Sequence, residues 1–187
     1  MKIHFPLKWE LTPCGSKWDK VGQSDIQVDQ QHPVSSSLPF PGGVFVGQFD
    51  HALDTKRRIT IPSDWRDVAG ETVFFVLPGI GEKCLYVFGE SQMRLKLEKI
   101  ARVSVGDQQA QRLIRSVFGN ACRVVVDGHG RIRVNDALLS YAGIQTQATL
   151  VGAAGRFEIW SPESWKDQQG SQLNPEALRL GASFIGL

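Results

Sequence analysis

The chain has 187 residues, of which 42% are hydrophobic, enough for one core or for two small units that share a core. Its formal net charge of +2 is too small by itself to indicate nucleic-acid binding. No apolar run approaches the roughly 20 residues of a membrane-spanning helix, and the first residues lack the apolar stretch of a secretory signal. We therefore expect a cytoplasmic protein with no membrane partner.

The cysteine content excludes two further classes of protein. The three cysteines, Cys14, Cys84 and Cys122, are odd in number and contain no CxxC pair. A disulfide framework or a four-cysteine zinc site is therefore not expected, in keeping with a reducing cytosol. Cys122 and His129 would supply only two ligands, which do not make a metal site.

Residues 1–43 differ in composition from the rest of the chain. Pro, Ser and other polar residues cluster between Gln30 and Gly43, without helical or strand periodicity. Such composition predicts a disordered N-terminal extension.

A turn motif then occurs twice, in residues 53–62 and again in residues 126–135. Asp54 and Arg58 of the first copy correspond to Asp127 and Arg131 of the second, at an offset of 73 residues. Each copy predicts a strand end, a turn opened by Asp, and a short alternating strand. The repeat indicates a tandem duplication of one β-rich unit of roughly 45 residues.

The hydrophobic pattern around each motif predicts the remaining elements. Ile59 and Ile61 are expected to face inward, and Ser63 is expected to cap a short helix that Gly70 ends. In the second copy Asn135 takes the capping position. The expected strands are residues 44–53, 58–61, 72–77, 84–88, 122–126, 149–151 and 157–160.

Two helices are expected between the copies, at residues 90–102 and 108–118. Six cations lie on their polar sides: Arg94, Lys96, Lys99, Arg102, Arg112 and Arg115. This arrangement fits a solvated face, or alternatively a subunit contact or a secondary phosphate contact. From Lys166 onward the sequence predicts a mostly disordered tail.

The turn motif has a physical rationale. Asp at the start of a turn accepts backbone N–H bonds, so Asp54 and Asp127 are expected to be structural. Gly128 and Gly130 allow positive φ in the second turn. Arg58 and Arg131 can reach back to the carboxylate, or point outward to a phosphate or a guanine edge.

Lys56 and Arg57 are expected to be exposed and to form a compact positive tip with Arg58. Such a tip suits phosphate and major-groove contact, although a basic turn can also be merely solvated. A catalytic role is not expected. Asp50, His51 and Asp54 imitate a base with an orienting carboxylate, but no nucleophile motif accompanies them.

Three stretches of the sequence resemble the MraZ family. They are Phe45-x-Gly47 with His51-x-Leu53-Asp54-x-Lys56-x-Arg58-x-x-x-Pro62, then Asp127-x-x-Gly130-Arg131, and then Leu150-Val151-Gly152 with Arg156-Phe157-Glu158-Ile159-Trp160. The resemblance implies a mainly β fold with short helices, in which two tandem AbrB-like swapped-hairpin units form a pseudo-dimeric barrel. It also implies a ring-forming homo-oligomer without a cofactor.

The function implied is that of a non-enzymatic transcriptional regulator, expected to be a repressor. It would bind direct repeats of double-stranded DNA upstream of its own division and cell-wall gene cluster, at the nucleoid. Lys56, Arg58 and Arg131 match the family's basic loop positions, and Arg57 adds a fourth candidate. The alternative is a protein-interaction module that uses the ring scaffold without specific DNA binding.

The expected organisation is an extension at 1–43, a first unit at 44–93, a helical connection at 94–120, a second unit at 121–165 and a tail at 166–187. Two departures from the family pattern bear on the turns. The family usually has Gly where this chain has Arg57, which costs roughly 1–3 kcal/mol if the turn shape is kept. Asn135 replaces the usual Pro of the second motif, which we interpret as structural.

The extension at 1–43 is also unusual for the family, whose chains usually start at about Val44. Val can be encoded by an alternative GTG start codon, so residues 1–43 can also be a misassigned start. Mass spectrometry of the native protein tests this, and a peptide from 1–40 would exclude it.

Overall fold

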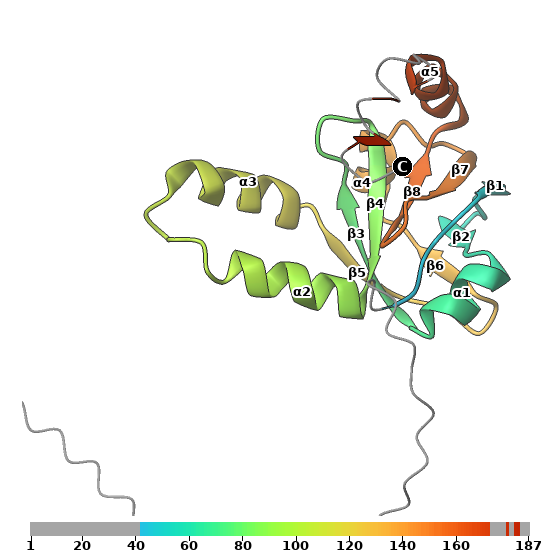
Figure 1. Ribbon diagram of the computed structural model, residues 1–187. Helices are drawn as coiled ribbons and strands as arrows, with labels where there is room; N and C mark the ends of the chain where they lie inside the picture. The colour runs from blue at the N-terminus through green and yellow to red at the C-terminus, as the bar shows by residue number, and fades with distance from the viewer. Residues whose placement is uncertain (1–41, 173–178, 180–181, 184–187) are drawn as a thin grey trace, which may run out of the picture. The chain divides into compact units, whose positions relative to one another are not determined.

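The computed structural model describes residues 42–172, 179 and 182–183 (Figure 1). The strands in these residues are β1 Gln48–Ala52, β2 Arg58–Thr60, β3 Val73–Pro78, β4 Cys84–Gly89, β5 Cys122–Val125, β6 Arg131–Arg133, β7 Gln147–Gly152 and β8 Phe157–Trp160. The helices are α1 Ser63–Ala69, α2 Glu90–Ile100, α3 Gln108–Phe118, α4 Asp136–Tyr141 and α5 Pro162–Gln172.

The strands form one six-stranded antiparallel sheet and one two-stranded ribbon. The sheet order is β1-β7-β8-β4-β3-β5, and the ribbon consists of β2 and β6. Strands of the first turn copy pair with strands of the second: β1 with β7, β4 with β8, β3 with β5, and β2 with β6. The two copies therefore interleave and share one sheet, rather than folding side by side.

The predicted barrel is not closed. Among the described strands, β1 pairs only with β7 and β5 only with β3, so these two strands are the edges of an open sheet. The mainly β class with short helices is confirmed. Sequence periodicity indicates which face of a strand is buried, but not whether the two edge strands reach each other.

The core draws on both copies. Ile59 of β2 lies opposite Ile132 of β6, and both side chains are almost fully buried. An aromatic group completes the core, with the Trp65 ring centroid 5.7 Å from that of Phe45 and 5.1 Å from that of Phe157. Burying a side chain of this size stabilises the fold by about 1.5–3 kcal/mol. Because the partners come from different copies, each copy's core depends on the other.

Two of the three helix caps predicted from the sequence are confirmed. Gly70 ends α1 with a left-handed φ of +57°, and the Asn135 side chain accepts a hydrogen bond from the Leu138 amide at the start of α4. The predicted cap at Ser63 is wrong. Pro62 occupies the N-cap position of α1, and the Ser63 hydroxyl contacts Asp64 instead.

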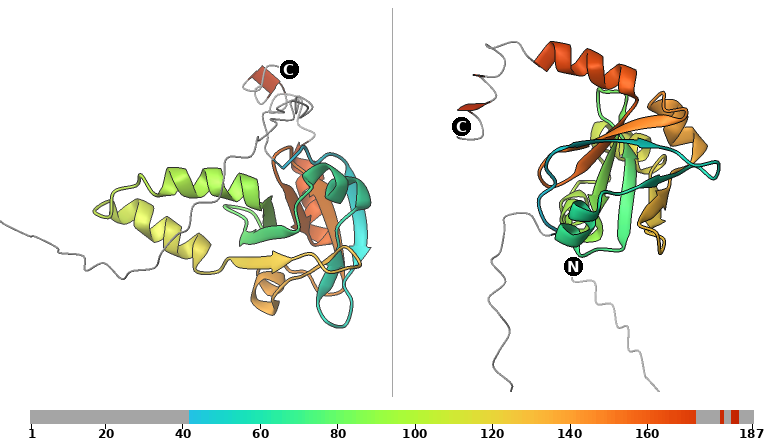
Figure 2. Two further views of the ribbon diagram at one scale, coloured as in Figure 1. Left: turned by 90° about the horizontal axis from the view of Figure 1, so that it is seen from below. Right: turned by 90° about the vertical axis from the view of Figure 1, so that its right-hand side faces the viewer.

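Helices α2 and α3 form a pair that extends away from the sheet (Figures 1 and 2). A small cluster that contains Leu77, Phe88 and Met93 anchors the base of the pair. One of the six cations is not simply solvated, because the Lys96 ammonium lies 4.4 Å from the Phe88 ring centroid. Leu113 of α3 is 52% exposed, so the apolar face of this pair is only partly covered.

The prediction of a mostly disordered tail from Lys166 onward is wrong for the first residues of that tail. Helix α5 continues to Gln172, so residues 166–172 are helical. Trp165 anchors this helix, with its indole N–H donating to Gln48 of β1 and its ring 5.6 Å from that of Trp160. The predictions for residues 1–41, and for most of the chain beyond Gln172, lie outside the described residues. No helix of the described part has the length and apolar character to cross a membrane.

Candidate nucleic-acid interface

The β2–β6 ribbon carries the two predicted turns on one surface. In its register Arg58 lies opposite Arg133, Ile59 opposite Ile132, and Thr60 opposite Arg131. Since neighbouring side chains on a strand alternate, the two isoleucines point into the core and the three arginines point outward. The ribbon thus brings Arg58 and Arg131 together, although they are 73 residues apart in sequence.

Each Asp organises its own turn by the same three hydrogen bonds. In loop 1 (residues 54–58), Asp54 Oδ1 accepts from the backbone amides of Lys56 at 2.8 Å and Arg58 at 2.9 Å, and Oδ2 accepts from Arg58 Nε at 2.7 Å. In loop 2 (residues 127–131), Asp127 accepts from the amides of His129 and Arg131, and from Arg131 Nε at 3.0 Å.

The two turns are also linked to each other. Arg58 Nη1 lies 3.4 Å from Asp127 Oδ2, and Arg131 Nη1 lies 3.6 Å from Asp54 Oδ2. The backbone amide of Arg58, with its side chain, lowers the pKa of Asp54, and the side chain of Arg131 lowers the pKa of Asp127. We call these four residues the carboxylate–guanidinium network. Its two negative and two positive charges balance, so it adds no net charge to the surface.

The two arginines differ in how completely they are engaged. Within the described residues, Arg58 uses Nε and Nη1, and its Nη2 group has no recorded protein acceptor. Arg131 directs all three nitrogens at carboxylates, with Nε and Nη2 on Asp127 and Nη1 towards Asp54. A guanidinium has five N–H donors, so Arg58 retains more donors for an external acceptor than Arg131 does.

The excess positive charge lies beside loop 1. An open hollow of about 650 Å³ is lined by Thr55, Lys56, Arg57, Arg58, Arg133 and Asp136. Lys56 and Arg133 are exposed and have no salt bridge within the described chain. Arg133 was not among the predicted site residues. The available signal was its position two residues after Arg131 on an alternating strand, which places both on one face.

Arg57 adopts the left-handed backbone conformation that glycine occupies most easily, with φ of +59°. Its side chain turns to the second copy, where Nε lies 3.0 Å from Asp136 Oδ1 and Nη1 donates to the Gln145 carbonyl oxygen at 3.0 Å. Lys56 and Arg57 are both exposed. The contacts with Asp136 and Gln145 hold the Arg57 side chain in place.

Loop 2 is less basic at its tip. His129 stands at the position that corresponds to Lys56, and Gly130, with φ of +76°, stands at the position of Arg57. The Arg66 guanidinium lies against Gly130, because a Cβ atom added there would be 2.6 Å from Arg66 Cζ. Arg66 was also missed from sequence, since its helix follows the first turn and its contact is with the second.

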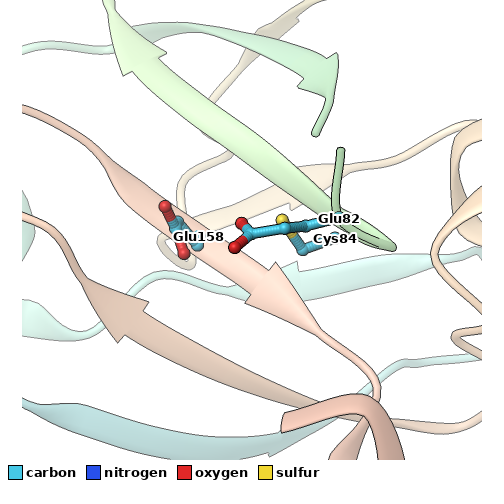
Figure 3. Close-up of side chains that lie close together, drawn as sticks. All are labelled: Glu82, Cys84 and Glu158. Carbon is cyan, nitrogen blue, oxygen red and sulfur yellow. The ribbon is translucent and has the colours of Figure 1, made fainter. Parts of the chain in front are cut away.

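The remaining titratable groups do not form a second site in the described residues. The Asp50 carboxylate accepts a hydrogen bond from the Thr149 hydroxyl, and Cys122 and His129 join no group of three metal-ligating side chains. One group of three does occur, formed by Glu82, Cys84 and Glu158 (Figure 3). Its carboxylate oxygens already accept from the side chains of Tyr86, Gln168, Arg156 and Trp160. Burial raises the pKa of the Cys84 thiol, which opposes the thiolate that a metal needs.

These features define a duplicated β-rich protein that presents paired basic turns on a two-stranded ribbon. A family model described as "MraZ protein, putative antitoxin-like" matches residues 44–116 and 117–178, and the chain belongs to this family. Among its relatives, proteins named "Transcriptional regulator MraZ" are 33% identical in Clostridium acetobutylicum, 31% in Clostridium tetani and 32% in Finegoldia magna. Each match covers 77% of this chain and all of the relative.

Proposed function

We propose that this protein is a transcriptional regulator that binds double-stranded DNA in a sequence-specific manner through the β2–β6 ribbon. The observation that carries the proposal is the charge of the ribbon surface. The network neutralises its own two arginines. Around one open hollow, Lys56, Arg57 and Arg133 outnumber the single carboxylate of Asp136, so the hollow keeps a net positive charge. The relatives named as transcriptional regulators favour the same conclusion.

The side chains have different roles in this proposal. Lys56 and Arg133 bind backbone phosphates, because both are exposed cations beside the turn. Arg57 adds phosphate or base contact. Arg58 and Arg131 face the bases, and Arg58 is better suited to a guanine edge because its Nη2 group remains available. Asp54, Asp127 and Gly130 hold the turns in shape.

The pairing of strands between the copies supports a pseudo-dimer of swapped-hairpin units at 44–93 and 121–165, joined by a helical connection at 94–120. One ribbon makes few phosphate contacts and should bind weakly. A homo-oligomeric ring presents many ribbons to direct repeats in DNA, which raises the overall affinity through linkage. We place these repeats upstream of the protein's own division and cell-wall gene cluster, where binding represses transcription. The protein would act at the nucleoid, without catalysis or a cofactor.

A salt-titrated gel shift tests this proposal, with DNA from upstream of the gene and scrambled DNA of equal length. We expect preferential binding whose affinity falls steeply with salt, because neutralised phosphates release counterions. Lys56→Ala and Arg58→Ala should weaken specific binding in proteins that remain folded. Lys83→Ala is the matched control, since it removes an exposed cation from the turn between β3 and β4. Equal, weak binding to both DNAs would reject the proposal.

One observation favours the alternative of a protein-interaction module. A hollow of about 420 Å³ lies between α3, α4 and the turn that follows β3, and three exposed apolar side chains line it: Ile80, Leu113 and Tyr141. Under this alternative the basic turns are only solvated. Loss of partner capture in Leu113→Ser, with DNA binding absent in the wild type, would support it over DNA binding.

A further inference from the structure

The ion pair between Arg57 and Asp136 joins loop 1 to the other copy. It connects the tip of the most basic turn to the first residue of α4, over 3.0 Å. Both side chains line the basic hollow, and Asp136 is the one carboxylate that the described residues place in its lining. An anion of the protein itself therefore already contacts a guanidinium that is directed into a proposed phosphate site.

The pair is accessible enough to exchange. The Arg57 side chain is 46% exposed and the Asp136 side chain 72% exposed, so water and ions reach both partners. An exposed pair of this kind contributes little stability, and screening by salt weakens it further. The second contact of Arg57, to the Gln145 carbonyl oxygen, does not depend on Asp136 and keeps the guanidinium oriented if the carboxylate leaves.

The corresponding position in loop 2 shows the contrast. Gly130 stands in place of Arg57, and Ser63 stands in place of Asp136 at the same offset of 73 residues. Both members of the pair are therefore absent from that side of the ribbon. The cation and its internal anion occur together on the loop 1 side.

We propose that Asp136 is an internal competitor for phosphate, which occupies Arg57 in the free protein and is replaced by a DNA backbone phosphate on binding. This inference rests on the proposed function, which it deepens by naming a regulating contact at the same site. Loop 1 then binds DNA more weakly than its three consecutive cations would allow. The cost is lower affinity for any DNA, and the consequence is that binding depends more on base contacts made by Arg58.

The test compares DNA affinity and its salt dependence for Asp136→Asn and Asp64→Asn. Asp64 is the matched control, because it is an exposed carboxylate in the first turn of α1 and has no salt bridge within the described residues. We expect Asp136→Asn to tighten binding to scrambled DNA by about 1.5- to 5-fold, the scale of one surface ion pair. The salt slope should steepen by up to about one counterion, and Asp64→Asn should change both quantities much less.

The same Asp136→Asn substitution in a protein that lacks Arg57 distinguishes release of Arg57 from a general effect of the lost negative charge. In Arg57→Gln, the Asp136→Asn substitution should no longer tighten binding, because the guanidinium that it releases is absent. Equal tightening with and without Arg57, or equal effects of the two Asp→Asn variants, would overturn the inference while leaving DNA binding intact. If the folded wild-type protein bound neither the upstream DNA nor the scrambled DNA, the proposed function would be rejected, and the inference with it. Thermal unfolding of each variant shows that the fold is retained.

Discussion

Gly128 and Gly130 lie two residues apart in loop 2, yet alanine should have opposite effects at the two positions. Gly130 has φ of +76°, and a Cβ atom there would lie 2.6–2.9 Å from the Arg66 guanidinium. Gly128 has no positive φ, and a Cβ atom there would meet nothing within 4 Å. The pair therefore tests the left-handed backbone of Gly130 together with its close contact to Arg66, within a single turn.

The magnitudes follow from these contacts. A left-handed alanine costs about 1–2 kcal/mol, and displacing Arg66 breaks its 3.2 Å hydrogen bond to the Ile61 carbonyl oxygen, worth about 0.5–1.5 kcal/mol. Gly130→Ala should thus lower the free energy of unfolding by roughly 1.5–3.5 kcal/mol. Gly128→Ala should raise it by about 0.4–1 kcal/mol, because alanine restricts the unfolded chain.

Urea denaturation of the full chain measures both variants against the wild type. With a denaturant slope of about 1–3 kcal/mol per molar, the two midpoints should differ by roughly 1 M or more, with similar slopes. Equal midpoints would refute the reasoning, since the turn would then tolerate a side chain at either glycine. DNA affinity should fall more in Gly130→Ala than in Gly128→Ala, because Arg66 and Arg131, which lie next to Gly130, must shift.

Two further predictions concern titration and reactivity. The lowered pKa values of Asp54 and Asp127 stabilise the fold above their unfolded pKa of about 3.9, and this stability is lost as pH falls below it. Unfolding free energy should therefore be flat from about pH 7 to 5 and fall below about pH 4, less steeply in Asp127→Asn. Cys84 is buried, and burial raises the pKa of its thiol. Alkylation at pH 8, followed by site-resolved mass spectrometry, should therefore be much slower in the folded protein than in urea, and similar rates would contradict its burial.

The alternation of residues predicted the inward isoleucines of the ribbon, and single residues predicted two helix ends. Ile59 and Ile132 are buried because the spacing on a strand assigns each side chain to a face. Gly70 and Asn135 act where predicted because their roles depend on backbone groups within a few residues. Ser63 failed as a cap because Pro62, one position earlier, takes the N-cap place.

The sequence by itself determined each Asp turn, since all three hydrogen bonds of Asp54 are made to residues no more than four positions away. Only the tertiary structure decided how the turns combine. Arg58 reaches Asp127 across 69 residues, and Arg57 reaches Asp136 across 79, because β2 pairs with β6. Local spacing carries no information about which distant strands pair, so the balanced network, the added cation of Arg133 and the open sheet followed only from the fold.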